Sequence, residues 1–292
     1  QLAWYQPLAT PTTDLKQILA PQLEKFKLSA TSFNAFLDVS RGGPQEFLLN
    51  NLLHFPKAKG PSASYGTAIH WTMQQAHTHL AATGEQKPLE DVLHDFESAL
   101  KKERLSEQDT AFFLQKGSED LPVFLGSNVL PIKASQKAEV DFRYQDVIVA
   151  NARLTGSLDL IDVDETEQTL IVTDYKTGRP SESWNKGDEH TKLKLHKYRQ
   201  QLIFYKILVE NSPLYGKYQV TQGQLAFIEP TKAGESIVLT IDLSDQDIER
   251  TTKLIEAVWK RIVTLDLPDT SSYSEDLKGV LAFEQDLIDE II

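Results

Sequence analysis

The chain has 292 residues, of which 40% are hydrophobic and 25% are charged, and it carries a formal net charge of −12. This composition is typical of a soluble globular protein with enough length for a large core, and the acidic balance argues against a chain that coats nucleic acid non-specifically. The absence of cysteine excludes disulfides, thiolate zinc sites, cysteine nucleophiles and cysteine-ligated iron–sulfur clusters.

The N-terminal segment shows no targeting signal. Residues 1–16 contain neither the basic start nor the apolar run of a secretory signal, and no stretch of the chain approaches the roughly 18 consecutive apolar residues of a membrane helix. The first residue is Gln rather than Met, which indicates a fragment or a processed product. From these features we expect a cytoplasmic protein that does not associate with membranes.

Residues 1–130 are predicted to be mainly helical. Thr31 or Ser32 is a candidate N-cap, Gly84 is a candidate C-cap, and Pro88 suits the first turn of a helix. Four segments carry helical patterns: "TSFNAFLDVS" (31–40), "GPQEFLLNNLL" (43–53), "SASYGTAIHWTMQQAHTHLAATG" (62–84) and "PLEDVLHDFESALKKERL" (88–105).

The period then changes to that of β-strands. Three strand segments, 137–149, 152–163 and 168–177, are followed by a helix, two more strands, a long helix and an acidic tail with an apolar stripe. The later segments are 193–209 (helix), 218–229 and 235–243 (strands), 244–265 (helix capped by Ser244) and 274–292 (tail, predicted to be a packed or docking helix). This order predicts a single α/β domain with a helical N-terminal elaboration.

The segment "VTDYKTG" (172–178) closes the third strand with charged residues. Because residues two apart in a strand share a face, Leu170 and Val172 lie on the same face as Asp174 and Lys176. An acid and an amine at the mouth of an apolar face need either each other or a ligand.

The preceding strand carries a second acid among apolar neighbours. In "LTGSLDLIDV" (154–163) the residue in this position is Asp159, and a tight turn near Asp164 makes the two strands neighbours. Asp159 and Asp174 are therefore expected to come together, where two carboxylates repel unless a cation joins them. Oxygen ligands favour a hard ion such as Mg²⁺ or Mn²⁺. The alternative is a surface hairpin with a solvated Asp and an ordinary Asp–Lys pair.

Four motifs in this order resemble the PD-(D/E)xK nuclease superfamily in its RecB-like branch. They are "SATSFNAFLDVSRGGPQEFLL", "YGTAIHWTMQQA", "GSLDLID" followed by "VTDYKTG", and "QLIFY". The resemblance runs from about Thr31 to Tyr205. It implies a restriction-endonuclease-like core, in which a mixed central sheet is flanked by helices, and one RecB-like nuclease domain over residues 1–292. Within it, residues 1–130 are the helical part, 131–265 the catalytic core and 266–292 the acidic helical tail.

The resemblance also implies a role for each matching residue. His70, Asp159 and Asp174 match metal ligands, the backbone carbonyl of Tyr175 matches a fourth one, and Lys176 matches the catalytic lysine. Mg²⁺ or Mn²⁺ is the implied cofactor. Many relatives carry cysteines in the stretch that corresponds to "RGGPQEFLL", and some bind an iron–sulfur cluster with them, but this chain has none.

A glutamine and a tyrosine on the following helix complete the implied site. Gln201 and Tyr205 match the family's Gln-x-x-x-Tyr pair, and a spacing of four places both on one helical face. Gln200 is an alternative without that spacing, and Tyr205 is also compatible with a role as a core aromatic residue. His77 lies near His70 on the same predicted helix, but no motif includes it.

The function that the resemblance implies is a metal-dependent deoxyribonuclease of exonuclease type. Its expected partners are DNA, as single strands or helicase-unwound ends, and a covalently or non-covalently linked helicase. Residues 174–206 contain eight Lys and Arg against four acids, which is compatible with a phosphate-tracking path or with a solvated surface. The second hypothesis is a catalytically inactive nuclease-fold module that binds DNA or a partner protein.

Overall fold

The computed structural model describes residues 15–290. Residues 1–14, which make up most of the segment without a secretory signal, and the last two residues of the predicted tail lie outside the described residues. No helix within 15–290 combines the length and the apolar character that a membrane span requires.

The helices form an N-terminal series and three later members. They are α1 (Leu15–Lys25), α2 (Ala30–Leu37), the 3₁₀ turn η2 (Val39–Arg41), α3 (Gly43–Phe47), the π-helical turn η3 (Leu48–Leu52), α4 (Pro61–Thr83), α5 (Leu89–Lys102), α6 (Glu107–Gly126), α7 (Glu189–Glu210), α8 (Asp245–Thr264) and α9 (Leu277–Asp289).

The strands form a mixed five-stranded sheet in the order β1-β4-β5-β6-β7 and a separate two-stranded hairpin, β2-β3. Their bounds are β1 (Gln136–Asp141), β2 (Val147–Val149), β3 (Ala152–Leu154), β4 (Ser157–Asp164), β5 (Thr169–Lys176), β6 (Gln219–Phe227) and β7 (Ile237–Asp242). Only the β5–β6 pair is parallel among the pairs of this sheet, because α7 carries the chain back to the edge at which β5 began.

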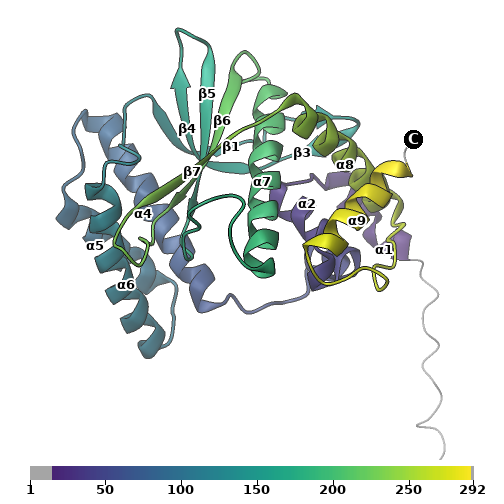
Figure 1. Cartoon of the computed structure of the whole chain (residues 1–292), viewed down its shortest axis with the longest axis horizontal. Helices are drawn as coiled ribbons and strands as arrows, with labels where there is room; N and C mark the ends of the chain where they lie inside the picture. The colour runs from purple at the N-terminus through teal and green to yellow at the C-terminus, as the bar shows by residue number, and fades with distance from the viewer. Residues whose placement is uncertain (1–14, 291–292) are drawn as a thin grey trace, which may run out of the picture.

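Helices cover both faces of the sheet (Figure 1). On one face α4, α5 and α6 enclose a core that includes Phe96 and the ring of Tyr175. On the other face α2, α7, α8 and α9 enclose a larger core that includes Phe33 and Phe204. The predicted mixed sheet flanked by helices, with a helical N-terminal part, is therefore confirmed.

Two strand predictions were too long. The segments 137–149 and 152–163 are each divided, into β1 and β2 and into β3 and β4. Ala150 and Asn151 have positive φ angles of 46° and 65°, which form the tight turn between β2 and β3. β2 and β3 thus form a hairpin outside the five-stranded sheet. The alternation of apolar residues in the sequence does not reveal this division.

The predicted N-cap of the first motif helix was wrong. Ser29 caps α2 in a capping box, in which its hydroxyl accepts from the backbone N–H of Ser32 and the hydroxyl of Ser32 accepts from that of Ser29. The candidate Ser32 is thus the third helical residue. The caps Gly84 and Ser244 are confirmed, whereas Pro88 is the residue before α5.

Two further helix predictions differ from the structure in extent or in setting. The helix predicted at 193–209 begins earlier, at Glu189 after the cap Asp188. The sequence pattern missed the first turn because that turn is polar and carries no apolar period. The tail contains α9, which buries Val280, Phe283 and Leu287 in the core. Of the two alternatives for the tail, the packed helix is therefore the one observed.

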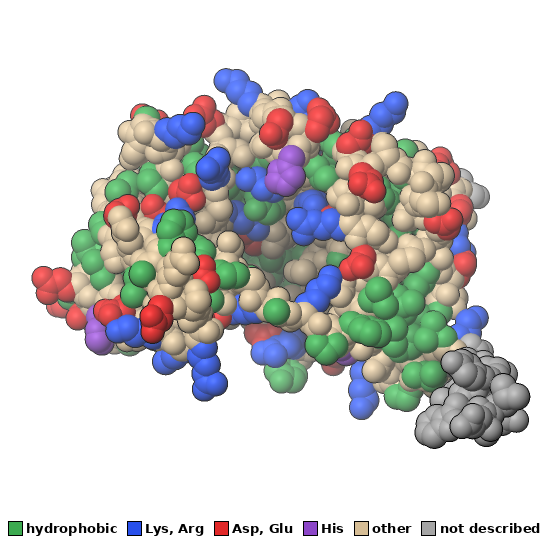
Figure 2. All heavy atoms as spheres, turned by 90° about the horizontal axis from the view of Figure 1, so that it is seen from below, with side chains coloured by type: hydrophobic (Ala, Val, Ile, Leu, Met, Phe, Trp, Pro, Cys, Tyr) green, Lys and Arg blue, Asp and Glu red, His purple; other side chains and the backbone are tan. Residues whose placement is uncertain are grey.

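The end of the sheet where β5 leads toward α7 is open to solvent. A view from below shows a hollow in this part of the surface, bordered by Lys and Arg side chains (Figure 2). The residues of the predicted site lie at this end of the sheet.

Candidate active site

Asp159 and Asp174 meet because β4 and β5 are antiparallel neighbours. Leu160 is paired with Thr173, so the next residues along the two strands, Asp159 and Asp174, lie side by side. The backbone N–H of Tyr175 donates a hydrogen bond of 2.8 Å to Oδ2 of Asp159. The two strands therefore bring Asp159 and Asp174 together as predicted.

His70, on α4, reaches Asp159. Its Nδ1 lies 3.1 Å from Oδ1 of Asp159. Gly66, one turn earlier in α4, allows a close approach, because a Cβ there would lie 3.3 Å from Oγ1 of Thr177. Burial acts to lower the pKa of His70, but the hydrogen bond to Asp159 and the surrounding carboxylates raise it above its usual value.

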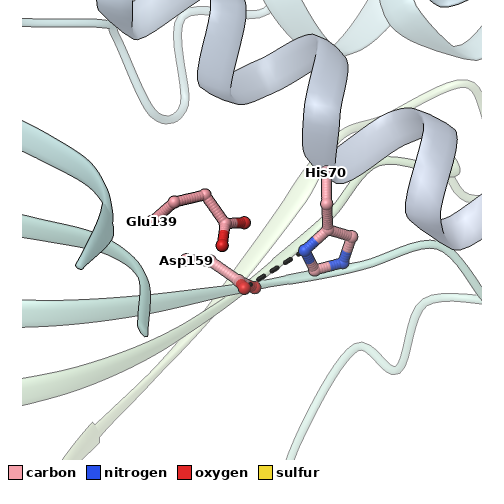
Figure 3. A group of neighbouring side chains, drawn as sticks. All are labelled: His70, Glu139 and Asp159. Atoms are coloured by element: carbon pink, nitrogen blue, oxygen red, sulfur yellow. Dashed lines mark ion pairs between the residues drawn. The ribbon is translucent and has the colours of Figure 1, made fainter. Parts of the chain in front are cut away.

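A third acid, Glu139, belongs to the same group and was missed in the sequence analysis. Within residues 15–290, His70, Glu139 and Asp159 are the group whose ligand atoms all lie within 4.8 Å of one another (Figure 3). Ala138 and Val140 of β1 pair with Leu160 and Leu158, which places Glu139 beside Asp159.

The backbone and the surroundings of Glu139 are unusual. Its φ angle is 50°, a left-handed conformation that is uncommon for residues other than glycine and that often occurs at functional sites. Ser157 donates a hydrogen bond of 3.2 Å to its carboxylate. Burial raises the pKa of Glu139, and the nearby negative charge of Asp159 raises it further.

The donor set of this group fits a hard divalent cation. One imidazole nitrogen and carboxylate oxygens are ligands that Mn²⁺ and Mg²⁺ accept. Burial and the negative charge of Asp159 both raise the pKa of Glu139, so the two carboxylates repel each other here. A bound cation would relieve this repulsion.

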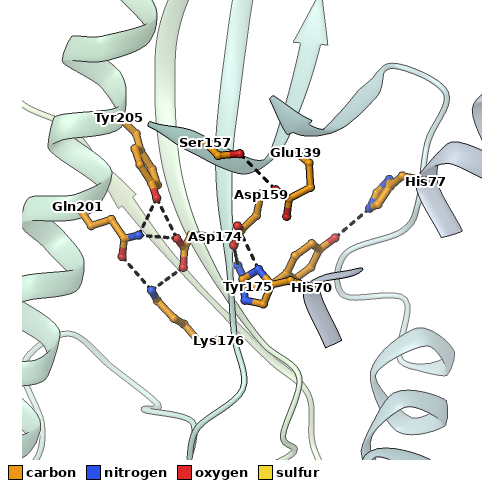
Figure 4. Close-up of polar contacts among 10 residues, drawn as sticks. All are labelled: His70, His77, Glu139, Ser157, Asp159, Asp174, Tyr175, Lys176, Gln201 and Tyr205. Atoms are coloured by element: carbon orange, nitrogen blue, oxygen red, sulfur yellow. Dashed lines mark hydrogen bonds and ion pairs between the residues drawn. The ribbon is translucent and has the colours of Figure 1, made fainter. Parts of the chain in front are cut away.

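Asp174 lies in a second cluster, next to the first (Figure 4). Its side chain is 4% exposed, and Nζ of Lys176 lies 2.6 Å from its Oδ2, although that oxygen accepts no hydrogen bond of regular geometry from the described residues. Burial raises the pKa of Asp174, and Asp159 adds to this, while Lys176 opposes it. Asp174 and Lys176 therefore form a buried ion pair in which Oδ2 of Asp174 still lacks a regular hydrogen bond.

Gln201 connects the members of this second cluster. Its Nε2 donates to Oδ1 of Asp174 and to the hydroxyl of Tyr205, both at 2.7 Å. Its Oε1 accepts from Nζ of Lys176 at 2.8 Å. The hydroxyl of Tyr205 also lies 3.5 Å from Oδ1 of Asp174. Tyr205 is thus a buried core residue whose hydroxyl lies in the second cluster, and its accessory role stays a prediction.

The neighbouring Gln200 has a different environment. It is buried, and its Nε2 donates a hydrogen bond of 2.6 Å to Glu284 of α9. His77 is also outside the carboxylate groups, because its Nε2 lies 3.0 Å from the hydroxyl of Tyr175. Burial lowers the pKa of His77 to about 4, so a neutral imidazole anchors the Tyr175 side chain on the face opposite Asp174.

The adjacent glutamines provide a matched pair of variants. Gln201→Ala should reduce catalytic turnover by roughly 10- to 100-fold, because it frees both Asp174 and Lys176, at little cost in fold stability. Gln200→Ala should leave turnover close to that of the parent and lower the melting temperature, because it removes a partner of the buried Glu284. Steady-state kinetics and thermal melts of both variants check this. Equal losses of turnover in the two variants would contradict the separation.

Comparison with known proteins agrees with the geometry. The sequence matches the family model of the PD-(D/E)XK nuclease superfamily over residues 27–273. The crystal structure of a candidate exonuclease from Eubacterium rectale is similar, with a TM-score of 0.51 and 12% sequence identity over 90% of this chain and 88% of that chain. At this identity the likeness shows a shared fold. No curated protein sequence gives a significant match.

Proposed function

The chain belongs to the PD-(D/E)XK nuclease superfamily, and from this premise we propose that it is a metal-dependent deoxyribonuclease of the RecB-like branch that hydrolyses DNA phosphodiester bonds. The observation that carries the proposal is the convergence of Asp159, Asp174 and Lys176 at one end of the sheet, with His70 beside them. These residues come from α4, β4 and β5, so the convergence is a product of the fold.

We assign the metal ligands to the residues around Asp159. His70, Asp159 and Glu139 would hold a divalent cation, with Asp174 and the backbone carbonyl of Tyr175 at its border. Such an ion, when bound, supplies Lewis acidity that neutralises the phosphodiester and lowers the pKa of a water molecule.

The other residues act on the phosphate and on one another. The ammonium of Lys176 donates hydrogen bonds and stabilises negative charge that develops on the phosphoryl oxygens. Burial acts to lower the pKa of Lys176, but Asp174 raises it above its usual value, which keeps the side chain protonated. Gln201 and Tyr205 hold Asp174 and Lys176 in place for that role.

We further propose the exonuclease type, with single strands or helicase-unwound ends as substrate and a linked helicase as partner. The order of the RecB-like motifs supports this. The related structure from Eubacterium rectale, described as a candidate exonuclease, has a name that agrees with it. Residues 1–292 would then act as one nuclease domain.

The experiment that tests the function is incubation of the purified chain with labelled single- and double-stranded DNA. We expect cleavage with Mg²⁺ or Mn²⁺ and none in EDTA. Mn²⁺ should support at least as much cleavage as Mg²⁺, because an imidazole ligand such as His70 suits Mn²⁺ better. Full cleavage in EDTA would overturn the metal-dependent mechanism.

One observation favours a second function. Lys176 already neutralises Asp174 at 2.6 Å, an arrangement that also suits an inactive nuclease-fold module that binds DNA or a partner protein. In that case DNA would bind without being cut under any of the metal conditions above.

A further inference from the structure

A pocket of about 470 Å³ lies beside the active site, between α2, η2 and the N-terminal half of α7. Lys176 and Gln201 belong to its lining, so it opens directly onto the proposed reaction centre. Its other basic lining residues are Arg41, His190, Lys194 and Lys197. No acidic side chain of residues 15–290 lines it, although the whole chain carries a net charge of −12.

The positive charge of the pocket is only partly neutralised by the protein. Asp38 forms an ion pair with Lys197 at 2.7 Å and lies 3.9 Å from Arg41, so two cations share one buried carboxylate. Lys194 donates to the backbone carbonyl of Arg179 at 3.2 Å, and none of the ion pairs within residues 15–290 includes it.

The surroundings of Lys194 also disfavour its charge. Burial lowers its pKa, Glu229 and, less strongly, Asp188 act to raise it, and the charge of Lys176 acts in the same direction as burial. Glu229 forms its own ion pair with Lys116 at 2.8 Å. A partly buried ammonium without a carboxylate partner is stabilised by an external anion.

Lys194 and Lys176 both approach the ring of Tyr198. Nζ of Lys176 lies 4.0 Å and Nζ of Lys194 lies 6.0 Å from the centroid of the Tyr198 ring. The two ammonium groups thus contact one aromatic ring, one from β5 at the reaction centre and one from α7 in the pocket. An anion at Lys194 would therefore lie in the same pocket that Lys176 lines.

We propose that this pocket, through Lys194, Lys197 and Arg41, binds a second phosphate group of the nucleic-acid strand, next to the phosphate that is cleaved. The inference rests on the proposed function and adds a subsite to it. The hollow bordered by Lys and Arg side chains in Figure 2 gives a strand access to this end of the sheet. The hydroxyl of Thr31, which also lines the pocket, is a further hydrogen-bond donor for a phosphate oxygen.

The test measures binding without cleavage. Single-stranded oligonucleotides of one sequence, with hydroxyl or phosphate groups at either end, are titrated in EDTA and followed by fluorescence anisotropy. Lys194→Gln should raise Kd roughly tenfold, as for the loss of one charge-assisted contact. It should also reduce the slope of log Kd against log salt concentration by about 0.7, the value for one phosphate contact with a single strand.

Two variants serve as controls. Lys192→Gln removes a lysine of the same helix that is paired with Glu189 at 2.7 Å and lies outside the pocket lining, so it should leave Kd and the salt slope unchanged. Lys194→Arg keeps the charge and should bind nearly as well as the parent. Should Lys194→Gln melt at a much lower temperature, Arg41→Gln, whose side chain is 78% exposed, tests the same pocket without disturbing the core.

The outcomes separate the source of the phosphate. A loss confined to phosphate-ended oligonucleotides assigns the pocket to a terminal phosphate, and an equal loss with all ends assigns it to an internal one. An unchanged Kd and salt slope in both pocket variants, or a parent that does not bind the oligonucleotides, overturns the inference. Binding in EDTA does not depend on catalysis. A parent that binds through Lys194 in EDTA but cuts no DNA with Mg²⁺ or Mn²⁺ would therefore refute only the nuclease proposal.

Discussion

Asp174→Asn should abolish DNA cleavage, lowering turnover on the order of 1,000-fold or more, and should weaken or remove the thermal stabilisation by Mn²⁺. The substitution keeps the size of the side chain and removes the charge that lies between Asp159 and Lys176. A parent protein in Mn²⁺ at 100 times its Kd should gain about 2.7 kcal/mol in the free energy of unfolding. Thermal melts with and without Mn²⁺, together with a cleavage assay, measure both effects.

The same variant should be less stable than the parent in metal-free buffer. From the sequence alone, removal of one of two adjacent acids would relieve repulsion and stabilise the fold. In the structure, however, Lys176 lies 2.6 Å from Asp174, so the substitution would leave the Lys176 ammonium without its ionic partner. We expect a loss of about 1–3 kcal/mol in the free energy of unfolding.

Glu139→Gln separates the effect on Mn²⁺ binding from the effect on metal-free stability. Glu139 is a member of the group with His70 and Asp159, whereas the ion pair of Lys176 is with Asp174. The variant should require more Mn²⁺ for the same thermal shift and should keep its metal-free stability. If Mn²⁺ shifts the melting curves of the parent and of both variants equally, these carboxylates do not bind the ion, and the non-catalytic function becomes the better assignment.

Lys176→Ala should lose cleavage by about 100- to 1,000-fold while it retains the thermal shift in Mn²⁺. The ammonium contacts Asp174 and Gln201 but is not a metal ligand, so its removal leaves the donor atoms in place. With its neutralising partner absent, Asp174 becomes more available to a cation. Single-turnover cleavage kinetics and melts in a series of Mn²⁺ concentrations measure the two properties separately.

A matched comparison for this variant is Lys192→Gln. Lys192 belongs to an exposed ion pair with Glu189 and should change neither cleavage nor the Mn²⁺ shift. Cleavage by Lys176→Ala at the parental rate would show that the lysine has no part in the reaction. Loss of the Mn²⁺ shift in Lys176→Ala would instead show that the lysine is needed to build the metal site.

Local periodicity determined several features of this protein. The two-residue period of a strand placed Asp174 and Lys176 on the face of Leu170 and Val172, and in the structure that face packs toward α7. The four-residue spacing on a helix selected Gln201 over Gln200, and the two side chains indeed have separate partners, Asp174 and Glu284. Such features depend on neighbouring residues, which the sequence lists in order.

Other features required the pairing of distant segments. Glu139 reaches Asp159 only because β1 pairs with β4 and because its own backbone is left-handed. The sequence predicted one cation site that includes Asp159 and Asp174. In the structure Lys176 forms an ion pair with Asp174, and Glu139 lies in one group with Asp159. Which partner neutralises a buried charge is decided by competition among nearby groups in three dimensions.

The cationic pocket is the clearest case of a feature that only the tertiary structure decided. The sequence showed an excess of basic residues in 174–206 that suited a phosphate path and a solvated surface equally well. Packing of α2 and η2 against α7 joins Arg41 to Lys194 and Lys197 in one pocket, and Asp38 partly neutralises two of these three cations. The sequence alone thus determined the motifs and the faces on which they lie. Contacts between segments far apart in the chain determined which charges stay unpaired, because charge pairing depends on distance and burial rather than on sequence separation.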